Sequence, residues 1–455
     1  MHDARPIAAL ATARGTAALA VVRVSGTGAV EIVASRFSDA RLAAAAGRTV
    51  WVGWLHDGDG APVDQVVVTV WRGPHSSTGE DLAEVTCHGG DAVAQAVLRA
   101  LFAAGARPAE AGEFTSRAFL NGKLDLAQAE AVADLIAAES TLGRRAATSA
   151  LRGSISDAVD QVRQSLVDTA ALVELELDFG EEDVSFADRT QLAERLAEAD
   201  RLLTDLLGTA RLGALARDGV RVVLGGRPNA GKSTLLNALV RQDRAIVSPT
   251  PGTTRDAVEA EADLGGLRVR FLDTAGLRDT ADAIEAEGTR RARAAIDAAD
   301  VLLYVVDASQ GLDGEERSLL DALANRPGLA VLTVENKMDL AGEPADGALR
   351  ISARDALTNP DALDGLRQQI VAAVRAEGLD APQAGMVAIN ERHRRHLDAA
   401  RAAVRRAASA LAQGDGGDTL ALDLRAAFHE LGLVTGAITT EHVLDAVFSR
   451  FCIGK

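Results

Sequence analysis

The most informative stretch of this chain is residues 226–233, which read Gly226-Arg227-Pro228-Asn229-Ala230-Gly231-Lys232-Ser233. This is a complete G-x-x-x-x-G-K-S pattern, in which the glycines let the backbone wrap around phosphates. The apolar run 220–224 predicts a buried strand before the loop, and 234–239 predicts a helix after it. We therefore expect a P-loop α/β domain with Lys232 on the β- and γ-phosphates and Ser233 on Mg²⁺. The nucleotide contacts predicted in this loop are Asn229, Ala230, Gly231, Lys232, Ser233 and Thr234.

A second motif, N-K-M-D at residues 336–339, predicts which base is bound. The Asp339 carboxylate can accept both the N1–H and the 2-amino group of guanine, and adenine offers neither donor there. We expect the Lys337 stem to lie along the base and Asn336 to tie this loop to the phosphate loop. Downstream, a short loop fits the far side of the guanine, although an ordinary turn explains it equally well; its residues are Ser352 and Ala353.

Two segments between these motifs predict the switch regions of a GTPase. Residues 252–256 offer Thr254 as a second Mg²⁺ ligand, and Asp273 begins the second segment as a carboxylate that holds Mg²⁺ through water. Both segments are expected to be released on hydrolysis. A Gly265-Gly266 pair between them predicts a hairpin turn. The predicted switch contacts are Thr253, Thr254, Asp273, Thr274, Ala275 and Gly276.

The catalytic apparatus departs from that of Ras-like enzymes, because Leu277 stands where those enzymes carry a water-orienting glutamine. No arginine finger is evident from the sequence, although Arg227, Arg255 and Arg278 are nearby. Asn229 offers a carbonyl oxygen to a monovalent cation, whose charge could substitute for a finger. Three downstream carboxylates are candidates for orienting water, but surface acids are the simpler interpretation: Asp279, Asp282 and Glu285.

These motifs together resemble the bacterial and organellar tRNA-modification GTPase family called MnmE or TrmE. The resemblance rests on G-R-P-N-A-G-K-S, on G-T-T-R-D at 252–256 and on D-T-A-G-L-R at 273–278. It becomes specific through two segments that GTPases in general lack. These are F-L-N-G-K-L-D-L-A-Q-A-E at 119–130 and F-C-I-G-K at 451–455. The resemblance spans nearly the whole chain.

The resemblance implies GTP hydrolysis coupled to 5-aminomethyl or 5-carboxymethylaminomethyl modification of the wobble uridine of tRNA. It implies 5,10-methylenetetrahydrofolate or a related folate as one-carbon donor, and the flavoprotein MnmG as partner. Because the chain has no dinucleotide fingerprint, FAD is expected only through that partner. A constitutive homodimer through the N-terminal domains and a transient pairing of the GTPase domains are also implied. The alternatives are a ribosome-assembly GTPase without modifying chemistry and a nucleotide-dependent scaffold.

Several site residues follow from the resemblance alone. Arg23, Glu80, Lys123 and Lys455 would contact the folate, with the Glu80 carboxylate suited to the N–H groups of a pterin ring. Cys452 would present a thiol to the one-carbon site, or would simply be a small buried apolar residue. Glu285 would orient water, with Asp282 as second choice. The K⁺ ligands would be Asn229, Ser248, Thr250 and Thr253, in a loop stiffened by Pro249 and Pro251.

Composition sets further limits on function. The 455 residues carry a formal net charge of −17, which argues against a broad grip on DNA or RNA. The two cysteines, Cys87 and Cys452, form no C-x-x-C motif and suit a reducing cytoplasm. No signal-peptide pattern or membrane-length apolar run is present, so a cytoplasmic protein without a membrane partner is expected.

We expect an α/β multidomain chain. Residues 1–121 predict an N-terminal α/β domain for folate binding and dimerisation, and 122–215 predict a first helical segment. Residues 216–378 predict the GTPase domain, and 379–455 a second helical segment with the C-I-G-K tail. Since each amphipathic segment needs a partner, one bundle with the GTPase domain inserted is the economical solution. Two separate bundles are the alternative.

Other polar residues can be explained either by an ordinary structural role or by a functional one. Clusters at 23–26, 76–81 and 113–117 are explained by turn and cap chemistry, or by a ligand site. Arg394, Arg401 and Arg405 lie roughly on one side of a predicted helix. A solvated face is the simpler interpretation, and contact with tRNA phosphates is the alternative.

Overall fold

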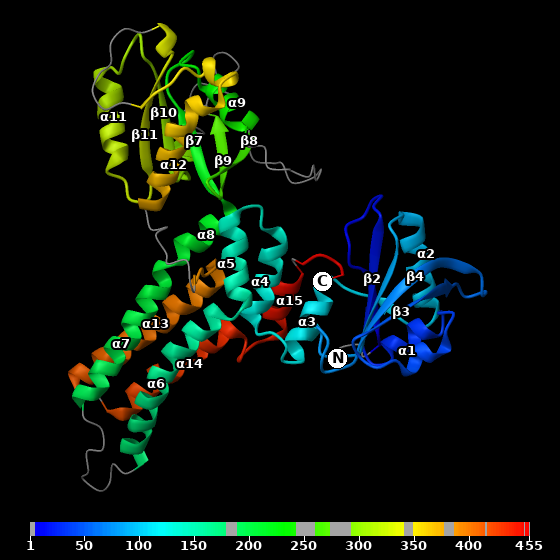
Figure 1. Ribbon diagram of the computed structural model, residues 1–455. Helices are drawn as coiled ribbons and strands as arrows, with labels where there is room; N and C mark the ends of the chain where they lie inside the picture. Colours follow the sequence, from blue (N-terminus) through cyan, green and yellow to red (C-terminus); the bar gives the residue numbers. More distant parts are fainter. Residues whose placement is uncertain are drawn as a thin grey trace, which may run out of the picture. The chain divides into compact units, whose positions relative to one another are not determined.

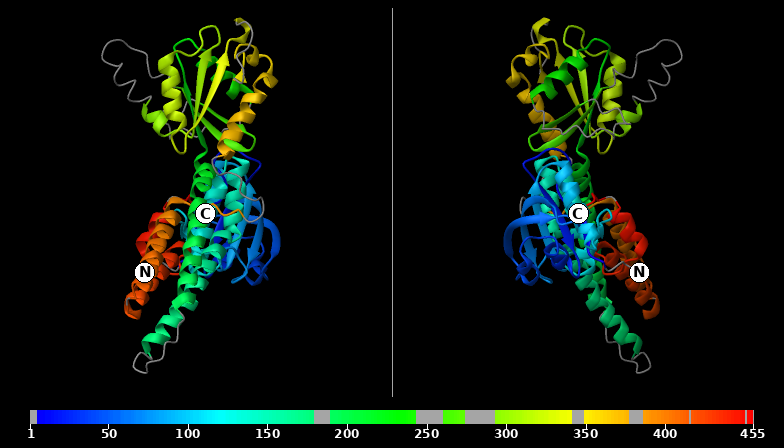
Figure 2. Two further views of the ribbon diagram at one scale, coloured as in Figure 1. Left: turned by 90° about the vertical axis from the view of Figure 1, so that its left-hand side faces the viewer. Right: turned by 90° about the vertical axis from the view of Figure 1, so that its right-hand side faces the viewer.

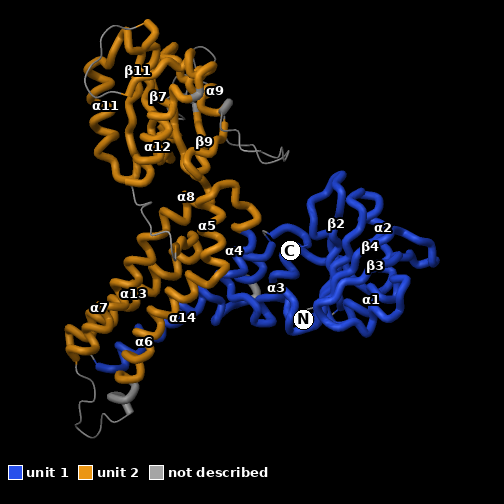
Figure 3. Tube along the Cα trace, viewed as in Figure 1, with its two compact units in different colours: residues 1–133, 415–455 blue, residues 134–414 orange. Residues whose placement is uncertain are grey.

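The computed structural model describes residues 5–178, 189–242, 260–273, 293–340, 349–376, 386–414, 416–449 and 451–454. The chain divides into two compact units (Figure 3). Unit 1 comprises residues 1–133 and 415–455, and unit 2 comprises residues 134–414. Among the described residues, each unit contains a six-stranded sheet.

The sheet of unit 1 has the order β3-β4-β5-β2-β1-β6. Its strands are antiparallel apart from the β1–β6 pair, which is parallel. One face packs on η1 (Ala40–Ala44), α1 (Ala29–Ala34) and α2 (Asp91–Ala103) through a core that includes Val22, Val24 and Leu101. The strands are β1 (Ile7–Leu10), β2 (Leu19–Ser25), β3 (Thr49–His56), β4 (Pro62–Trp71), β5 (Leu82–His88) and β6 (Arg107–Pro108). The α/β pattern expected of this region is confirmed.

The opposite face of this sheet carries polar side chains. Because side chains alternate along a strand, Arg23 and Ser25 point away from the core that holds Val22 and Val24. The short helix α3 (Glu113–Leu120) adjoins this face, where Phe114 forms a small cluster with Ile7, Ala9 and Ala109. The polar residues of β2 and α3 are therefore brought to one side of the sheet.

The C-terminal elements of unit 1 are α14 (Gly417–Thr435) and α15 (Glu441–Phe448). Phe448 and Phe451 pack with Leu126 and Ala129 at the start of α4 (Leu126–Ala137). The chain end then forms a bridge between Ile453 and Ala111, just before α3. A Cβ at Gly454 would lie 2.3 Å from the Leu10 carbonyl oxygen, so this approach requires glycine.

The sheet of unit 2 has the order β12-β11-β10-β7-β9-β8, parallel except for the β8–β9 hairpin. This confirms the hairpin predicted at Gly265-Gly266. In Figures 1 and 2 the sheet lies between α11 (Gly314–Ala324) on one face and α9 (Lys232–Gln242) with α12 (Asp364–Ala376) on the other. The strands are β7 (Val220–Gly225), β8 (Ala260–Leu264), β9 (Leu267–Asp273), β10 (Val301–Asp307), β11 (Ala330–Asn336) and β12 (Leu349–Arg350).

The remaining helices of unit 2 come from both sides of this sheet domain in the sequence. Before it come α5 (Thr141–Leu151), α6 (Ser154–Asp178), α7 (Arg189–Gly208) and α8 (Ala210–Asp218), and after it comes α13 (Glu391–Gln413). Since α13 packs along α7, the P-loop domain is inserted into a helical bundle, as predicted. None of the helices in the described ranges is both long and apolar enough to cross a membrane.

The sheet domain meets α5 and α8 through side-chain packing and a backbone hydrogen bond. Leu215 of α8 belongs to the hydrophobic core of the sheet domain. At the β8–β9 turn, the Gly266 carbonyl oxygen accepts the Leu142 N–H at 3.1 Å. Leu142 packs both on the core of the sheet domain and on the cluster around Ala146 and Leu212. These contacts seat the sheet domain on α5 and α8.

Candidate functional site

The phosphate loop has the backbone conformation of an anion cradle. Gly226, Asn229 and Gly231 adopt φ angles of 130°, 63° and 97°. A Cβ would lie 2.2 Å from the Val305 carbonyl oxygen at Gly226, and 2.2 Å from Asn336 Nδ2 at Gly231. Both positions therefore require glycine, because no side chain fits between the loop and its neighbours.

Lys232 begins α9 inside this cradle and is only 6% exposed. Its Nζ donates to the carbonyl oxygens of Gly226 at 3.0 Å and Arg227 at 2.8 Å. The loop thus surrounds an ammonium group at a helix N-terminus, an environment that suits phosphate oxygens. Ser233 follows in the first turn of α9, where its hydroxyl is suited to a cation bound beside the phosphates.

The N-K-M-D loop is tied to the phosphate loop through Asn336, which is 2% exposed. Its Nδ2 donates to the Ala230 carbonyl oxygen at 2.8 Å, and its Oδ1 accepts the Ala353 N–H at 2.9 Å. Ser352 Oγ donates to Asp339 Oδ1 at 3.3 Å, which joins the two loops that were predicted to flank a guanine. Asp339 is exposed, so its carboxylate is accessible to a ligand.

Lys337 has a partner that the sequence did not indicate. Its Nζ lies 2.7 Å from Oδ2 of Asp307, at the end of β10, and its backbone has a left-handed φ of 66°. Hydrogen bonds from Lys337 and Ser309, together with the Lys337 charge, lower the pKa of Asp307 to about 2. Asp307 is therefore an anion throughout the neutral range and fixes the end of the Lys337 stem. Only its position at the end of a buried strand, where ligand sites gather, could have suggested it.

The switch predictions fall mostly beyond the described residues. Asp273 ends β9, and its backbone pairs with Leu224 at the end of β7, which places it next to the strand that enters the phosphate loop. Apart from Asn229, the other predicted switch, cation and water-orienting residues lie outside the described residues: Ser248, Thr250, Thr253, Thr254, Thr274, Ala275, Gly276, Asp279, Asp282 and Glu285.

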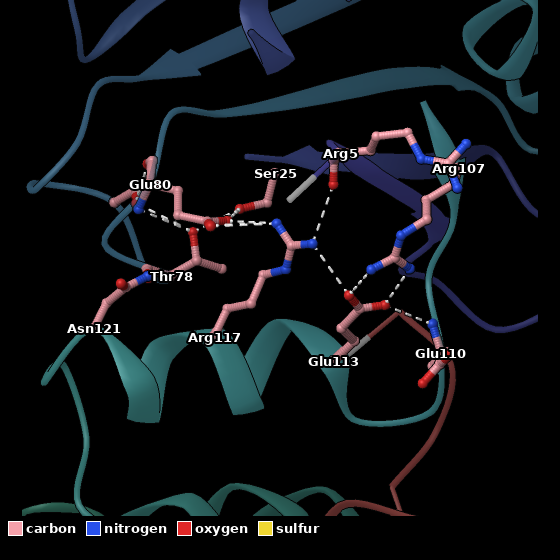
Figure 4. Close-up of polar contacts among 10 residues, drawn as sticks. Arg5, Ser25, Thr78, Glu80, Arg107, Glu110, Glu113, Arg117 and Asn121 are labelled. Atoms are coloured by element: carbon pink, nitrogen blue, oxygen red, sulfur yellow. Dashed lines mark hydrogen bonds and ion pairs between the residues drawn. The ribbon is translucent and has the colours of Figure 1, made fainter. Parts of the chain in front are cut away.

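A second polar site lies in unit 1, on the face of the sheet that carries Ser25 (Figure 4). Ser25 Oγ contacts Thr78 Oγ1 at 2.7 Å and donates to Glu80 Oε2 at 2.9 Å. Arg117 Nη1 donates to both carboxylate oxygens of Glu80, at 3.2 and 3.1 Å. Arg117 Nη2 lies 3.1 Å from Glu113 Oε1. Glu80 is thus held by a hydroxyl and a buried guanidinium.

Glu113 connects this group to Arg107. Arg107 Nη1 donates to Glu113 Oε2 at 2.8 Å, and the Glu110 N–H donates to the same oxygen at 2.9 Å. Burial raises the pKa of Glu113, but hydrogen bonds from Arg107, Glu110 and Arg117 and the Arg107 charge outweigh it, so the pKa is lowered overall. Glu113 is therefore ionised and keeps Arg117 in position.

The residues expected to contact a folate have different surroundings. The Arg23 guanidinium pairs with Glu84 at 2.7 Å and lies 5.7 Å from the centre of the Phe114 ring. Lys123 Nζ donates to the Pro74 carbonyl oxygen at 3.0 Å. Its stem lies within 3.3 Å of where a Cβ at Gly79 would stand, beside Glu80. Lys455 lies outside the described residues.

Cys452 is exposed, so the interpretation of this residue as a small buried side chain is wrong. Its carbonyl oxygen accepts the Gly112 N–H at 3.5 Å, one residue before α3. Cys87, in contrast, is buried, and burial raises the pKa of its thiol. Cys87 therefore packs, as expected.

Two of the simpler interpretations of polar residues hold only in part. The clusters at 23–26, 76–81 and 113–117 are not separate turns, because their members meet around Glu80 and Arg117. On α13 the Arg394 and Arg405 side chains are 45% and 58% exposed, as expected of a solvated face, but two of the arginines also have a partner on another helix. Arg401 and Arg405 both bind Asp200 of α7, with Nε–Oδ1 distances of 3.0 and 2.8 Å. These two guanidinium groups hold α13 on α7, which also weakens the case for a tRNA contact at this position.

Comparison with known proteins gives family matches along almost the entire chain. Residues 6–123 match "GTP-binding protein TrmE N-terminus", and residues 126–452 match "MnmE helical domain". The chain is similar to the tRNA modification GTPase MnmE of Salinibacter ruber, with 53% identity over 462 residues and 100% of both chains covered. It is also similar to that of Cytophaga hutchinsonii, with 42% identity over 458 residues, covering 99% of this chain and 97% of the relative.

Among solved structures, the chain is similar to a variant of Era from Aquifex aeolicus bound to GDP and AlF4⁻. The identity is 26%, the TM-score is 0.27, and the match covers 41% of this chain and 67% of the other.

Proposed function

The chain belongs to the MnmE family of tRNA-modification GTPases, and we propose that it couples GTP hydrolysis to C5 modification of the wobble uridine. In this proposal a folate one-carbon donor and the flavoprotein MnmG contribute to installing an aminomethyl or carboxymethylaminomethyl group. As a member of this family, the chain is a GTPase that acts on tRNA and uses Mg²⁺. The observation that carries the proposal is the 53% identity over the full length, which includes the N-terminal domain and the C-terminal tail as well as the GTPase motifs.

GTP is proposed to bind between the phosphate loop and the N-K-M-D loop. The Lys232 ammonium and the cradle around it support a role in holding the β- and γ-phosphates. The tie from Asn336 to Ala230 and Ala353 supports Asp339 as the guanine-reading carboxylate. Ser233 and Thr254 are proposed to hold Mg²⁺, which supplies charge stabilisation for phosphoryl transfer when bound.

The folate is proposed to bind on the polar face of the unit 1 sheet. Glu80 is held by Ser25 and Arg117 so that its position is fixed before a ligand arrives. Such a fixed carboxylate suits the N–H groups of a pterin ring. Arg23, Lys123 and Lys455 are proposed as further contacts, and Cys452 is proposed to face the same site. The bound folate would supply the one-carbon unit.

A homodimer is proposed to form through the same face of the sheet. The edge strand β3 exposes Val50, Val52 and Trp54, and Val67 of β4 lies opposite Val52. Val67 of β4 lies beside Thr86 of β5, which lies beside Val21 of β2. Because Val21 and Arg23 are on the same face of β2, the exposed residues of β3 and β4 share the face of Arg23. An exposed apolar strip on an edge strand is a surface that a second copy of the chain can cover. Sedimentation equilibrium tests this, and a monomer at micromolar concentration would contradict it.

The domain ranges 1–121, 122–215, 216–378 and 379–455 are also proposed. The boundary after residue 215 lies in the last turn of α8, which ends at Asp218, just before β7 begins at Val220. The boundary after residue 378 lies outside the described residues, between the end of α12 at Ala376 and the start of α13 at Glu391.

The function is tested by mass analysis of tRNA nucleosides from a strain that lacks this chain. Wobble uridines should lose the C5 substituent, and the wild-type chain should restore it. Glu80→Gln should fail to restore it while GTP hydrolysis is retained, because losing a charge-assisted contact weakens folate binding by roughly 10–100-fold. The matched control is Glu31→Gln, an exposed carboxylate of α1 outside this face.

The outcomes of this test separate the proposals. Unchanged nucleosides in the deletion strain would remove tRNA modification and favour the ribosome-assembly or scaffold interpretations. Full restoration by Glu80→Gln would remove the folate assignment and leave tRNA modification standing.

GTP hydrolysis should be at least tenfold faster in K⁺ than in Na⁺ at equal ionic strength, because loss of one preorganised electrostatic contact to developing charge costs about 10²–10³ in rate. The exposed Asn229 in the phosphate loop, with its φ of 63°, supports this cation site. Steady-state phosphate release in KCl and NaCl measures the ratio, and Asn229→Ala should abolish the difference. Equal turnover in the two salts would remove the cation from the mechanism.

A further inference from the structure

Arg227, the second residue of the phosphate loop, is bound to α11, the helix that covers the face of the sheet opposite α9 and α12. Its Nε donates to Glu316 Oε1 at 2.9 Å, and its Nη2 donates to Glu316 Oε2 at 2.7 Å. The same Nη2 lies 2.5 Å from Asp313 Oδ2. This is a two-pronged pairing of a guanidinium with a carboxylate, reinforced by a second carboxylate, and it fixes direction as well as distance.

The two carboxylates are themselves fixed. Asp313 caps α11, and its side chain accepts the Glu316 N–H while Glu316 Oε2 accepts the Asp313 N–H, which forms a capping box. Tyr304 of β10 donates its hydroxyl to Glu316 Oε1 at 2.8 Å. Burial and the neighbouring Glu316 raise the pKa of Tyr304, so its hydroxyl remains a donor. The acceptors of Arg227 are therefore held by both helix and sheet.

The backbone of Arg227 is held at its other end. Its carbonyl oxygen accepts Lys232 Nζ at 2.8 Å. Pro228 follows directly, which restricts the backbone of Arg227 to extended conformations. Gly226 precedes it, and a Cβ at that position would lie 2.2 Å from the Val305 carbonyl oxygen, so the loop lies close against β10 there. A rotation of the Arg227 peptide would therefore displace the Lys232 ammonium.

We propose that Arg227 is a positioning residue of the GTP site: its guanidinium anchors the phosphate loop on α11, and its anchored carbonyl group orients Lys232. Three residues outside the GTPase motifs therefore help to position the GTP site by holding Arg227: Glu316, Asp313 and Tyr304. It also separates Arg227 from an arginine finger, because the guanidinium is directed to α11 and is neutralised there. The inference rests on the proposed GTP site.

The experiment measures GTP affinity and single-turnover hydrolysis in Arg227→Ala. GTP affinity should fall roughly 10–100-fold, as expected for losing charge-assisted contacts, while kcat at saturating GTP changes by less than about threefold. Arg227→Lys should recover only part of the affinity, because an ammonium cannot pair in two prongs. Glu316→Gln should weaken binding in the same direction, and the double variant should be no weaker than Arg227→Ala.

Three controls make the result decisive. Arg326→Ala removes an ion pair with Asp297 on the same domain, and Arg326 and Arg227 side chains are both 37% exposed, so this variant should bind GTP normally. The triple variant Arg227→Ala, Asp313→Asn, Glu316→Gln removes the unpaired carboxylates and should remain weak. Lys232→Ala should lose GTP binding, and unfolding midpoints report whether each variant is folded.

Three outcomes would overturn the anchoring role. A kcat loss of about 10³–10⁵ with intact affinity would mark Arg227 as a finger. Full recovery in the triple variant would mean that Arg227 only neutralises two acids. Wild-type affinity in Arg227→Ala would mean that the contact is incidental. Normal GTP binding by Lys232→Ala would instead overturn the GTP site itself.

Discussion

Asp339→Asn should lower GTP affinity by roughly 10²–10³-fold, because an amide replaces the charged acceptor of two guanine donors. The same variant should bind xanthosine triphosphate better than GTP, since the new amide N–H can donate to the C2 carbonyl group of xanthine. Asp339 is exposed at the N-K-M-D loop, where Ser352 Oγ donates to it at 3.3 Å. Competition titrations with both nucleotides measure the exchange of preference.

Asp355→Asn is the matched control for this prediction. Asp355 is an exposed carboxylate in the short helix η5 (Asp355–Leu357) next to the Ser352 loop, and its replacement should leave guanine selectivity unchanged. If Asp339→Asn kept wild-type preference for GTP, the guanine-reading role would belong to another residue.

Glu285→Ala should reduce GTP hydrolysis by roughly 10²–10⁴-fold, the range for losing a positioned acid–base group. GTP affinity should change little, because an interaction made only in the transition state is lost. The reason lies in the sequence: Leu277 cannot orient water, and the family resemblance places a glutamate at this distance downstream of D-T-A-G-L-R. Single-turnover hydrolysis in K⁺ with a nucleotide titration measures both quantities.

Two further variants locate the role if this prediction fails. Glu315→Ala, at an exposed acid of α11, should hydrolyse GTP at the wild-type rate. Near-normal hydrolysis in Glu285→Ala combined with a large loss in Asp282→Asn would move the role to Asp282. A parallel loss of GTP affinity in Glu285→Ala would identify a binding residue instead.

Local features of the GTPase domain could be predicted from the sequence because they depend on neighbours along the chain. The phosphate loop needs positive φ at Gly226 and Gly231, and those glycines are visible in the motif. The β8–β9 hairpin follows from the Gly265-Gly266 pair. The N-K-M-D loop could be predicted for the same reason, and its expected hydrogen bond from Asn336 to Ala230 is present.

Polar groups that meet across the fold were not predictable in this way. Lys337 pairs with Asp307 and Arg227 with Glu316, at separations of 30 and 89 residues. Which acid pairs with which base depends on the order of the strands and on the face of the sheet that a helix covers. Neither of these produces a recognisable pattern in the sequence.

The polar site of unit 1 shows the same division. Each of its three clusters was visible as a polar stretch, yet turn chemistry explained each one by itself. Only the pairing of β2 with β5 and the position of α3 bring Ser25, Glu80 and Arg117 within hydrogen-bonding distance. Likewise Asp200 decides the role of Arg401 and Arg405, because helix packing places one carboxylate between two guanidinium groups. Neighbours along the chain are enough to specify the local loops. Which charges pair depends on distances in space, which are set only when the strands and helices pack.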